Sequence, residues 1–153
     1  MHFRKAAIED IPQMHAVRMA VKENRLSNPL LVTETDYIPY LTMLGKGWVC
    51  ETKDNGIVGF GIIDADKHNI WALFIQPGFE EKGIGSKLHT LMLNWYFRTH
   101  RTTLWLSTAF NTRAAVFYRT KGWKETGKYS ETEIKFEMSF EDWKRKNNDS
   151  YLK

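Results

Sequence analysis

IWALFIQPGFEEKGIGSKLHTLMLNWYF, residues 70–97, is the stretch that decides the fold. Residues 70–76 form a run of strand length rich in aromatic and branched side chains, and Pro77-Gly78 stops it. Over residues 84–98 the apolar residues recur at helical spacing, which predicts an amphipathic helix. The loop between them ends in Gly83-Ile84-Gly85-Ser86, where missing side chains let a ligand approach the main chain. The first helical N–H groups point outward there, and such helix ends bind anions, above all phosphates.

Length and composition predict a single domain that needs no disulfide or structural metal to be stable. Its 153 residues suit one core, with a domain over 1–140 and a polar C-terminal tail over 141–153, expected as a frayed helix or a loose segment. The single Cys50 excludes an internal disulfide and a four-cysteine zinc site, so we expect a reducing, cytoplasmic setting. No segment approaches the ~18 apolar residues of a membrane span, and we expect neither export nor a membrane partner.

Charge and histidine spacing argue against two further classes of site. The net charge of +4 is too mild to predict a nucleic-acid partner, and both signs are scattered along the sequence. The five histidines lack a metal-ligand spacing such as His-x-x-x-His, so no metal is expected.

The order of the predicted elements limits what the glycine loop can bind. Three antiparallel strands precede the loop, whereas a dinucleotide-binding Rossmann unit has its glycine loop after the first strand of a parallel sheet. The helix after the loop leads to a further strand, which predicts a right-handed crossover between two parallel strands. The expected strands cover 3–7, 48–52, 57–63, 70–76, 102–108, 123–129 and 134–140, and the expected helices cover about 9–24, 33–44, 84–98 and 111–121.

On the motif alone, two interpretations of the loop stay open. The helices that follow strands 70–76 and 102–108 can both direct their N-termini toward one ligand at the carboxyl ends of these strands. Backbone N–H groups from Lys82 to Ser86 can then cradle a pyrophosphate, with Lys82 and Lys87 as nearby positive charges. The alternative is a glycine-rich turn that only serves tight packing.

Residues in the second half of the chain favour the ligand. Asn111, the small pair Ala114-Ala115, and Phe117-Tyr118 before Gly122-Trp123 together resemble the signature of the GNAT superfamily of N-acetyltransferases. In the first half, residues 73–77 followed by 82–86 resemble that family's acetyl-coenzyme A motif. The two motifs stand in the family's order and at its spacing.

The resemblance implies both a fold and a reaction. The fold is α/β (α+β), with a GNAT-like, mostly antiparallel sheet of six to seven strands, a splayed parallel pair at its centre and about four flanking helices. The reaction is acetyl transfer from acetyl-CoA to a primary amine by direct attack on the thioester, without a covalent enzyme intermediate. The expected acceptor is a small amine or an amino-acid-like molecule, with a protein N-terminus or lysine as the alternative that the sequence leaves open. The closing hairpin and apolar surface could support a homodimer.

The resemblance also assigns roles to individual residues of this sequence. Main chain at Phe74 and Ile75 would bind the pantetheine arm and the thioester carbonyl, and main-chain N–H groups of 81–86 would hold the pyrophosphate. Tyr118 would protonate the departing thiolate, although an aromatic residue on a short helix is more often part of a core. The complete set of cofactor positions is Phe74, Ile75, Gln76, Glu81, Lys82, Gly83, Ile84, Gly85, Ser86, Asn111, Ala114 and Tyr118.

In one respect the sequence departs from the family. The family usually has Gln or Arg at the position of Glu80 and often Gly at that of Glu81. Two carboxylates beside the expected phosphates should weaken cofactor binding unless both side chains turn to solvent. Main-chain recognition of the phosphates is therefore a requirement of this interpretation.

Acceptor recognition is expected in the segment between the first two helices. Arg18 could hold a carboxylate of the acceptor, and Glu23 could hold its amine or act as the general base. A chain of water molecules is the other route for the proton, and a solvated helix face is the other interpretation of these side chains. The candidate acceptor residues are Arg18, Glu23, Asn24 and Ser27.

The sequence leaves two functions other than acetyl transfer open. A non-catalytic acyl-CoA-binding or sensing module would keep the cofactor pocket without turnover. An RNA-binding sheet, suggested by the aromatic content of 14%, has slight support because most rings lie within apolar strand patterns.

Overall fold

The structure, a computed structural model, describes residues 1–21 and 32–152. It divides into two compact units, Met1–Tyr96 and Phe97–Lys153, which are described one at a time. Over the described residues there are seven strands and five α-helices, so the predicted α/β class is confirmed.

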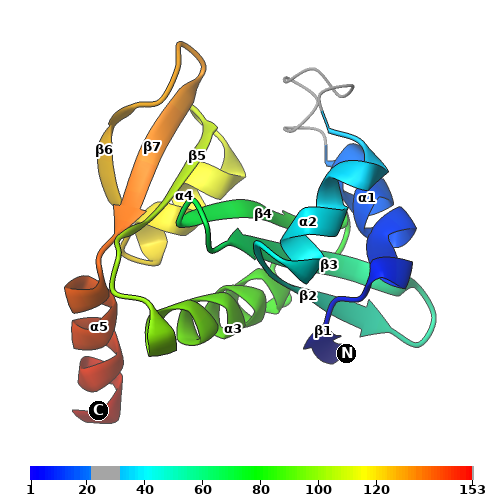
Figure 1. The fold of residues 1–153 in the computed structure, drawn as a ribbon, viewed down its shortest axis with the longest axis horizontal. Coiled ribbons are helices and arrows are strands. Elements are labelled where there is room, and N and C mark those ends of the chain that lie inside the picture. Colours follow the sequence, from blue (N-terminus) through cyan, green and yellow to red (C-terminus); the bar gives the residue numbers. More distant parts are fainter. Residues whose placement is uncertain (22–31, 153) are drawn as a thin grey trace. The chain divides into compact units, whose positions relative to one another are not determined.

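The first unit contains a four-stranded antiparallel meander (Figure 1). The β2–β3 turn ends at Gly56, whose φ of 66° is the left-handed conformation expected of a hairpin glycine. The three strands predicted before the glycine loop are confirmed, each with bounds within a few residues of those expected. The meander consists of β1 (His2–Lys5), β2 (Gly45–Thr52), β3 (Gly56–Asp64) and β4 (Asn69–Ile75).

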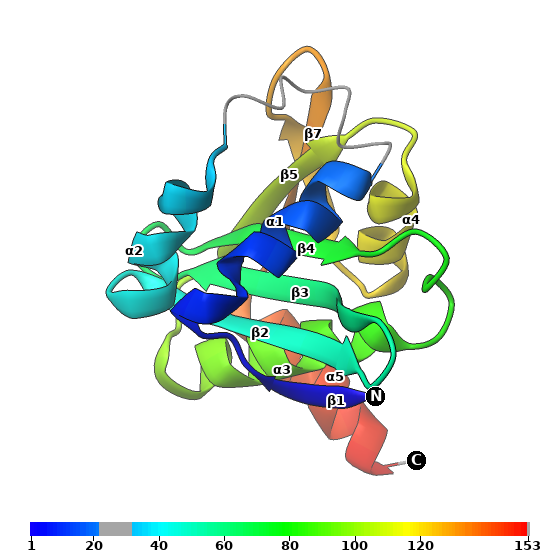
Figure 2. The same cartoon turned by 90° about the vertical axis from the view of Figure 1, so that its right-hand side faces the viewer.

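One face of this meander is covered by α1 (Ile11–Ala20), after the 3-10 turn η1 (Ile8–Asp10), and by α2 (Tyr37–Thr42), after η4 (Glu34–Asp36) (Figure 2). The predicted first helix was too long, because Val21 is already extended at φ −74° and ψ 113°. The second is shorter than predicted and begins with the 3-10 turn. Their shared core includes Ile11, Met14, Val17, Tyr37, Phe60, Ile62 and Ala72.

The opposite face is covered by α3 (Ile84–Thr99), the helix predicted over 84–98. Glycines on β3 let it approach closely. A Cβ added at Gly59 would lie 2.9 Å from Ile84 Cγ2, and one at Gly61 would overlap Met92 Sδ. Because these glycines alternate with Phe60 and Ile62 along β3, the strand presents small residues to α3 and large ones to α1.

Replacing Gly59 by alanine is expected to lower the free energy of unfolding by about 1–2 kcal/mol, the usual cost of overpacking a well-filled contact. The added methyl would meet side chains of both Ile84 and Ile75, so one of them must shift. Urea denaturation measures the change, and an unchanged midpoint would contradict this account of the helix contact.

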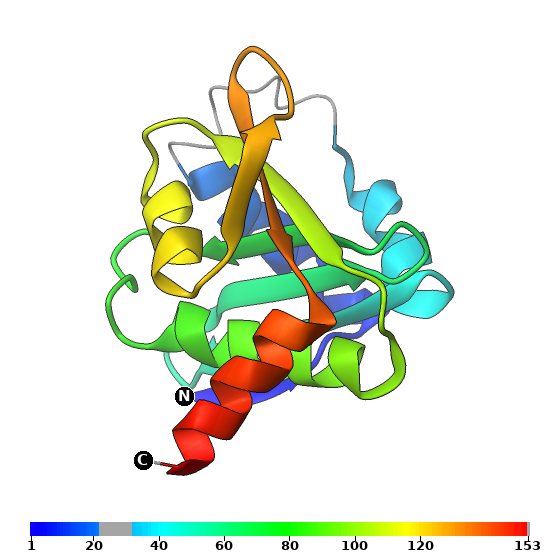
Figure 3. The ribbon, with the colours of Figure 1, turned by 90° about the vertical axis from the view of Figure 1, so that its left-hand side faces the viewer.

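The second unit contains an antiparallel three-stranded sheet in the order β5-β7-β6 (Figure 3, yellow-green to orange). Its buried side chains include Leu104, Leu106, Tyr118, Ile134 and Phe136. The predicted closing hairpin is confirmed. The elements are β5 (Leu104–Ala109), α4 (Arg113–Thr120), β6 (Lys124–Lys128), β7 (Glu133–Met138) and α5 (Phe140–Leu152).

Of the two alternatives expected for residues 141–153, a frayed helix or a loose segment, the structure has a helix, α5. Its first turns are anchored within the second unit, since the Trp143 ring stacks on Phe97 with centroids 5.2 Å apart. The buried Asp142 carboxylate pairs with Lys124 and Arg145 at 3.1 and 2.9 Å. These contacts make the segment an ordered helix, one more than the four expected. No helix of the described residues is long and apolar enough to cross a membrane.

Candidate active site

The loop after β4 begins with a tight turn that is encoded by its sequence. Phe79 N–H donates to the Gln76 carbonyl at 3.0 Å, and Gly78 has a φ of 96°. Proline at the second position and a left-handed glycine at the third are typical of a type II turn. The backbone N–H of Gln76 still donates a hydrogen bond to the Val58 carbonyl of β3 at 2.8 Å. The turn therefore reverses the chain immediately after the last sheet hydrogen bond.

The loop ends at the N-terminus of α3, where the backbone forms a candidate anion site. Lys87 N–H donates to the Gly83 carbonyl at 3.0 Å, which makes Gly83 the last residue before the helix. Glycine has no side chain with which to cap the amides of Ile84, Gly85 and Ser86. A Cβ added at Gly83 would meet no atom within 4 Å, so the space above this turn is open. A phosphate fits such a site, because the amides and the helix dipole both favour negative charge.

The two acidic residues of the loop have different backbone roles. The Glu80 carboxylate accepts a hydrogen bond from Gly78 N–H at 2.7 Å, which is upstream of the helix. Glu81 is exposed and has a φ of 62°, a left-handed conformation that favours glycine. The position thus has a backbone reason to prefer glycine, independent of charge.

Strand β4 contains a bulge that redirects one large side chain. Ala72 pairs with Ile62 but Ile70 pairs with Ile63, so Trp71 is the extra residue. Strict alternation would place Trp71 on the α3 face with Leu73. Instead its ring contacts α2, stacking on Tyr40 with centroids 4.5 Å apart. The bulge therefore gathers Trp71 and Phe74 on the face that α1 and α2 cover.

Arg18, in the last turn of α1, lies against these two rings. Its guanidinium carbon is 4.9 Å from the Trp71 centroid and 5.0 Å from the Phe74 centroid. Sequence reasoning selected Arg18 and Phe74 separately and missed Trp71 and Tyr40. The only local signal was the spacing of Tyr37 and Tyr40, three apart on a helix and hence on one face.

In the second unit, the turn between β5 and α4 displays Asn111. Thr112 is the N-cap, since its Oγ1 accepts from Ala115 N–H at 3.2 Å and donates to the Ala109 carbonyl at 2.8 Å. Asn111 precedes this cap, is exposed, and has a φ of 58°, which asparagine tolerates better than most residues. Because Thr112 caps the helix, Asn111 is not needed for that purpose. Ala114 is half-buried in the first turn of α4.

Tyr118 packs in the aromatic core of the second unit. Its side chain is 5% exposed and lies edge-on to Trp123 and tilted against Phe136, with centroids 5.5 and 6.2 Å away. Burial raises the pKa of the Tyr118 hydroxyl well above its ordinary value. The hydroxyl therefore keeps its proton throughout the neutral and mildly alkaline range.

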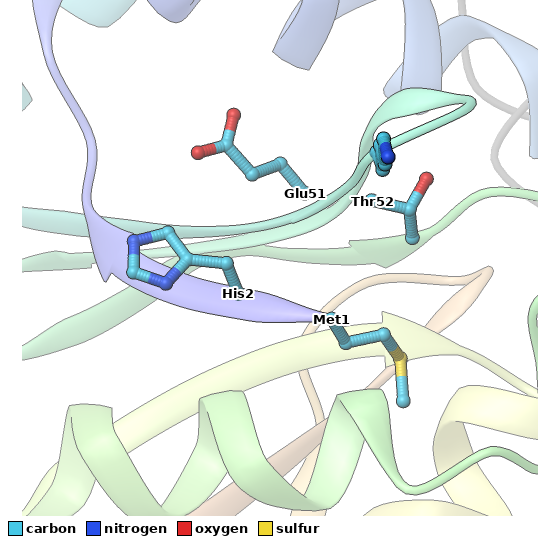
Figure 4. A pocket seen from close by; sticks show the side chains of 5 residues that line it. Met1, His2, Glu51 and Thr52 are labelled. Carbon is cyan, nitrogen blue, oxygen red and sulfur yellow. The ribbon is translucent and has the colours of Figure 1, made fainter.

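Three predicted residues, Glu23, Asn24 and Ser27, lie outside the described residues. Within 1–21 and 32–152, no group of His, Cys, Asp or Glu side chains has the arrangement of a metal site. A shallow pocket at the β1 edge of the first unit is unrelated to the predicted site, and none of the residues predicted from the sequence lines it (Figure 4). Its lining consists of Met1, His2, Glu51, Thr52 and Lys53.

Solved structures with a similar fold come from several organisms. The ribosomal-protein-S18-alanine N-acetyltransferase of Escherichia coli is 14% identical, with a TM-score of 0.72 over 91% of this chain and 93% of that one. A GNAT-family acetyltransferase from Staphylococcus aureus Mu50 is 15% identical, with a TM-score of 0.75 over 91% and 98%. Ard1 from Thermoplasma volcanium is 16% identical, with a TM-score of 0.73 over 90% and 96%. At these identities the likeness is one of fold.

Sequence comparison adds the family. No curated protein sequence gives a significant match. The acetyltransferase (GNAT) domain family matches residues 44–125, from the end of α2 to β6, which is more than half of the chain. That span contains both the open N-terminus of α3 and the Asn111 to Tyr118 segment. The resemblance inferred from the motifs is confirmed, and the protein belongs to the GNAT family of acetyltransferases.

Proposed function

We propose that this acetyltransferase moves an acetyl group from acetyl-CoA to the primary amine of a small, amino-acid-like acceptor. The observation that carries the proposal is the open N-terminus of α3, where Gly83 leaves three successive amides without a side-chain cap. Acetyl-CoA would supply the acetyl group as a thioester, from which an amine can take it directly. A small acceptor, a cytoplasmic location and a homodimer stay predictions.

Each cofactor residue then has a binding task. The amides at the start of α3, from Ile84 to Ser86, would hold the pyrophosphate, with Lys82 as a nearby cation. Main chain at Phe74, Ile75 and Gln76, at the carboxyl end of β4, would bind the pantetheine arm and orient the thioester. Asn111 and Ala114 would contact the cofactor from the start of α4. This division relies on backbone groups, so the carboxylates of Glu80 and Glu81 need not exclude the phosphates.

Proton transfers need two further groups. The Tyr118 hydroxyl would donate its proton to the departing thiolate, and its raised pKa ensures that the proton is present. The acceptor amine must lose a proton as it attacks. Strand β4 contains no Asp or Glu, so this proton would pass to Glu23 or to water.

The experiment that tests the proposal is thiol release from acetyl-CoA across a panel of acceptors. The panel contains simple primary amines, α-amino acids and short peptides with free N-termini. Release that depends on one acceptor class, together with mass-spectrometric detection of the acetylated amine, is the expected result. Binding of acetyl-CoA without release for any amine would instead favour the sensing module.

Replacing Glu81 by glycine is expected to raise the affinity for coenzyme A about threefold, because it removes an exposed like charge beside the phosphates, and one exposed charge pair is worth about 0.2–1 kcal/mol. The same change removes the strain of a left-handed backbone at a residue with a side chain, which costs about 1–2 kcal/mol. Glycine also adds conformational entropy to the unfolded state, which offsets about 0.4–1 kcal/mol of this gain. Stability should therefore stay the same or rise slightly.

The matched control is Glu131→Gln, which neutralises a carboxylate that is 95% exposed in the β6–β7 turn. Calorimetric titration with coenzyme A should separate the two variants. If Glu81→Gly, Glu131→Gln and the wild type bind coenzyme A with equal affinity, the phosphates do not bind near Glu81.

A further inference from the structure

The aromatic rings around Arg18 hold its guanidinium in one place. Trp71 and Phe74 each present a ring within about 5 Å of the guanidinium carbon. Trp71 is itself fixed, because it stacks on Tyr40 and lies edge-on to Tyr37 with centroids 5.1 Å apart. A guanidinium stacked on aromatic faces keeps its N–H groups directed outward in its own plane.

A buried hydroxyl fixes the orientation of the same group. Tyr37 is fully buried and hydrogen-bonds to both Arg18 and His15, with 3.0 Å between its oxygen and His15 Nδ1. Since arginine has only donors, the hydroxyl accepts from Arg18, while the direction of its bond to His15 Nδ1 depends on the tautomer of the imidazole. Burial raises the pKa of Tyr37, so the phenol stays neutral. Three side chains from α1 and α2 thus form a chain of hydrogen bonds that ends in a positioned cation.

This cation lies beside the strand that is proposed to orient the thioester. Phe74 contributes its ring to Arg18, and its main chain belongs to the proposed thioester-binding segment of β4. No acidic residue occurs in β4 from Asn69 to Ile75. The carboxylates that influence Tyr37 are Glu34 and Asp36, which are exposed in η4 just before α2. Asp36 accepts from Thr33 N–H at 2.7 Å. Among the described residues, Arg18 is thus a positive charge in contact with two rings of this strand.

We propose that Arg18, held by Trp71, Phe74 and Tyr37, binds the carboxylate of the acceptor, so that the substrate class is an amine that also carries a carboxylate, such as an α-amino acid. This inference rests on the proposed acetyl transfer. A guanidinium offers five N–H donors in a planar fork and takes a carboxylate through two parallel hydrogen bonds. The short spacing between the amine and carboxylate of an amino acid matches a cation one side chain away from the thioester-binding strand. Amines that carry only positive charge are repelled at the same place.

The test compares each amino acid with its own primary amide as acceptor. The two differ only at the carboxylate, and the amide has the less basic amine, so amine basicity cannot produce a preference for the acid. The wild type is expected to favour the acid in kcat/KM by about tenfold or more, the worth of one charged, bidentate contact. Arg18→Met keeps the apolar stem against the rings and should bring the ratio to within about twofold of unity. Arg18→Lys keeps the charge without the fork and should be intermediate.

The matched control is Arg98→Met, which removes an exposed arginine from the last turn of another helix, α3. It should leave the acid-to-amide ratio unchanged. Tyr37→Phe removes the hydroxyl that orients the guanidinium and should raise KM for the acid more than it lowers kcat. A merely structural role for Tyr37 would instead reduce turnover of acid and amide alike. Tyr37→Phe also provides a second variant if Arg18→Met does not fold.

Binding measurements test the carboxylate site without requiring catalytic turnover. Calorimetric titration with an N-acetyl amino acid and with its amide probes the same contact through the expected product. Tighter binding of the acid by wild type, and not by Arg18→Met, supports the carboxylate site even if no amine releases thiol. Equal binding of acid and amide by wild type, no binding of either, or a preference that survives in Arg18→Met would each overturn it. Absence of thiol release with every amine counts against the proposed function alone.

Discussion

Tyr118→Phe is expected to lower kcat by about 100-fold, the lower end of what a positioned proton donor contributes. The change removes the hydroxyl proton and keeps the ring, so packing against Trp123 and Phe136 is retained. Because the cofactor would be held by main chain, its affinity should stay within about twofold of the wild-type value. Steady-state kinetics with saturating acetyl-CoA measure the first effect, and calorimetric titration measures the second.

Tyr96→Phe is the matched control for Tyr118→Phe. Tyr96 is also fully buried, burial raises its pKa to about 12, and its hydroxyl bonds to His68 Nδ1 at 2.8 Å. Removing that hydroxyl should lower the free energy of unfolding by about 0.5–1.5 kcal/mol and leave kcat unchanged. If the two variants lose the same stability and neither loses kcat, Tyr118 is only a core residue.

The pH dependence of kcat gives a further check on Tyr118. A tyrosine whose folded pKa is raised keeps its proton beyond the ordinary value of about 10. The hydroxyl is therefore fully protonated below that pH, and its contribution to stability is lost only as the pH rises through the folded pKa. We expect no loss of kcat from Tyr118 ionisation between pH 7 and about pH 10. A fall in kcat below pH 10 that disappears in Tyr118→Phe would contradict the raised pKa.

Gly83→Ala is expected to weaken coenzyme A binding by about tenfold, and Gly83→Val by about 100-fold, because each adds carbon where the phosphate would lie. The free protein offers no clash, since a Cβ at this position meets no atom within 4 Å. The backbone does add strain, because a φ of 82° costs an L-residue about 1–2 kcal/mol. Loss of affinity and loss of stability must therefore be measured separately.

Gly78→Ala provides that separation. Gly78 also has a left-handed φ, at 96°, and open space where a Cβ would lie, but it belongs to the turn before the helix. Both alanine variants should lose about 1–2 kcal/mol of stability in urea denaturation. Only the Gly83 variants should lose affinity for coenzyme A in calorimetric titration. Equal affinity losses at Gly78 and Gly83 would move the binding site away from the start of α3.

The meander, the glycine loop and α3 could be predicted because each is specified locally. Alternating and helical apolar spacing, the Asn55-Gly56 turn and the Pro77-Gly78 turn are short-range signals, and the structure retains all of them. The family resemblance also depended on such local features. For the same reason the start of α3 could be proposed as a phosphate site from the Gly83-Ile84-Gly85-Ser86 turn together with the motif from Asn111 to Trp123.

For helix α5 the sequence left two alternatives, a frayed helix and a loose segment. Its sequence is strongly polar, and its apolar anchors, Phe140 and Trp143, lie close together at its start. These rings gain their stabilisation from Phe97, which is more than forty positions earlier in the chain. A helix held mainly by tertiary contacts gives a weak periodic signal.

The sequence by itself indicated the order of the elements, the glycine turn proposed to hold phosphate, and the family, since these depend on local spacing and turn residues. Only the tertiary structure decided where Trp71 and Arg18 lie. Register in a sheet is set by two strands together, and the bulge opposite Ile63 turns Trp71 to the α1 face against the alternation of its own strand. Because the bulge places Trp71 beside Phe74, Arg18 contacts two aromatic rings, and the proposal of a carboxylate site depends on that arrangement.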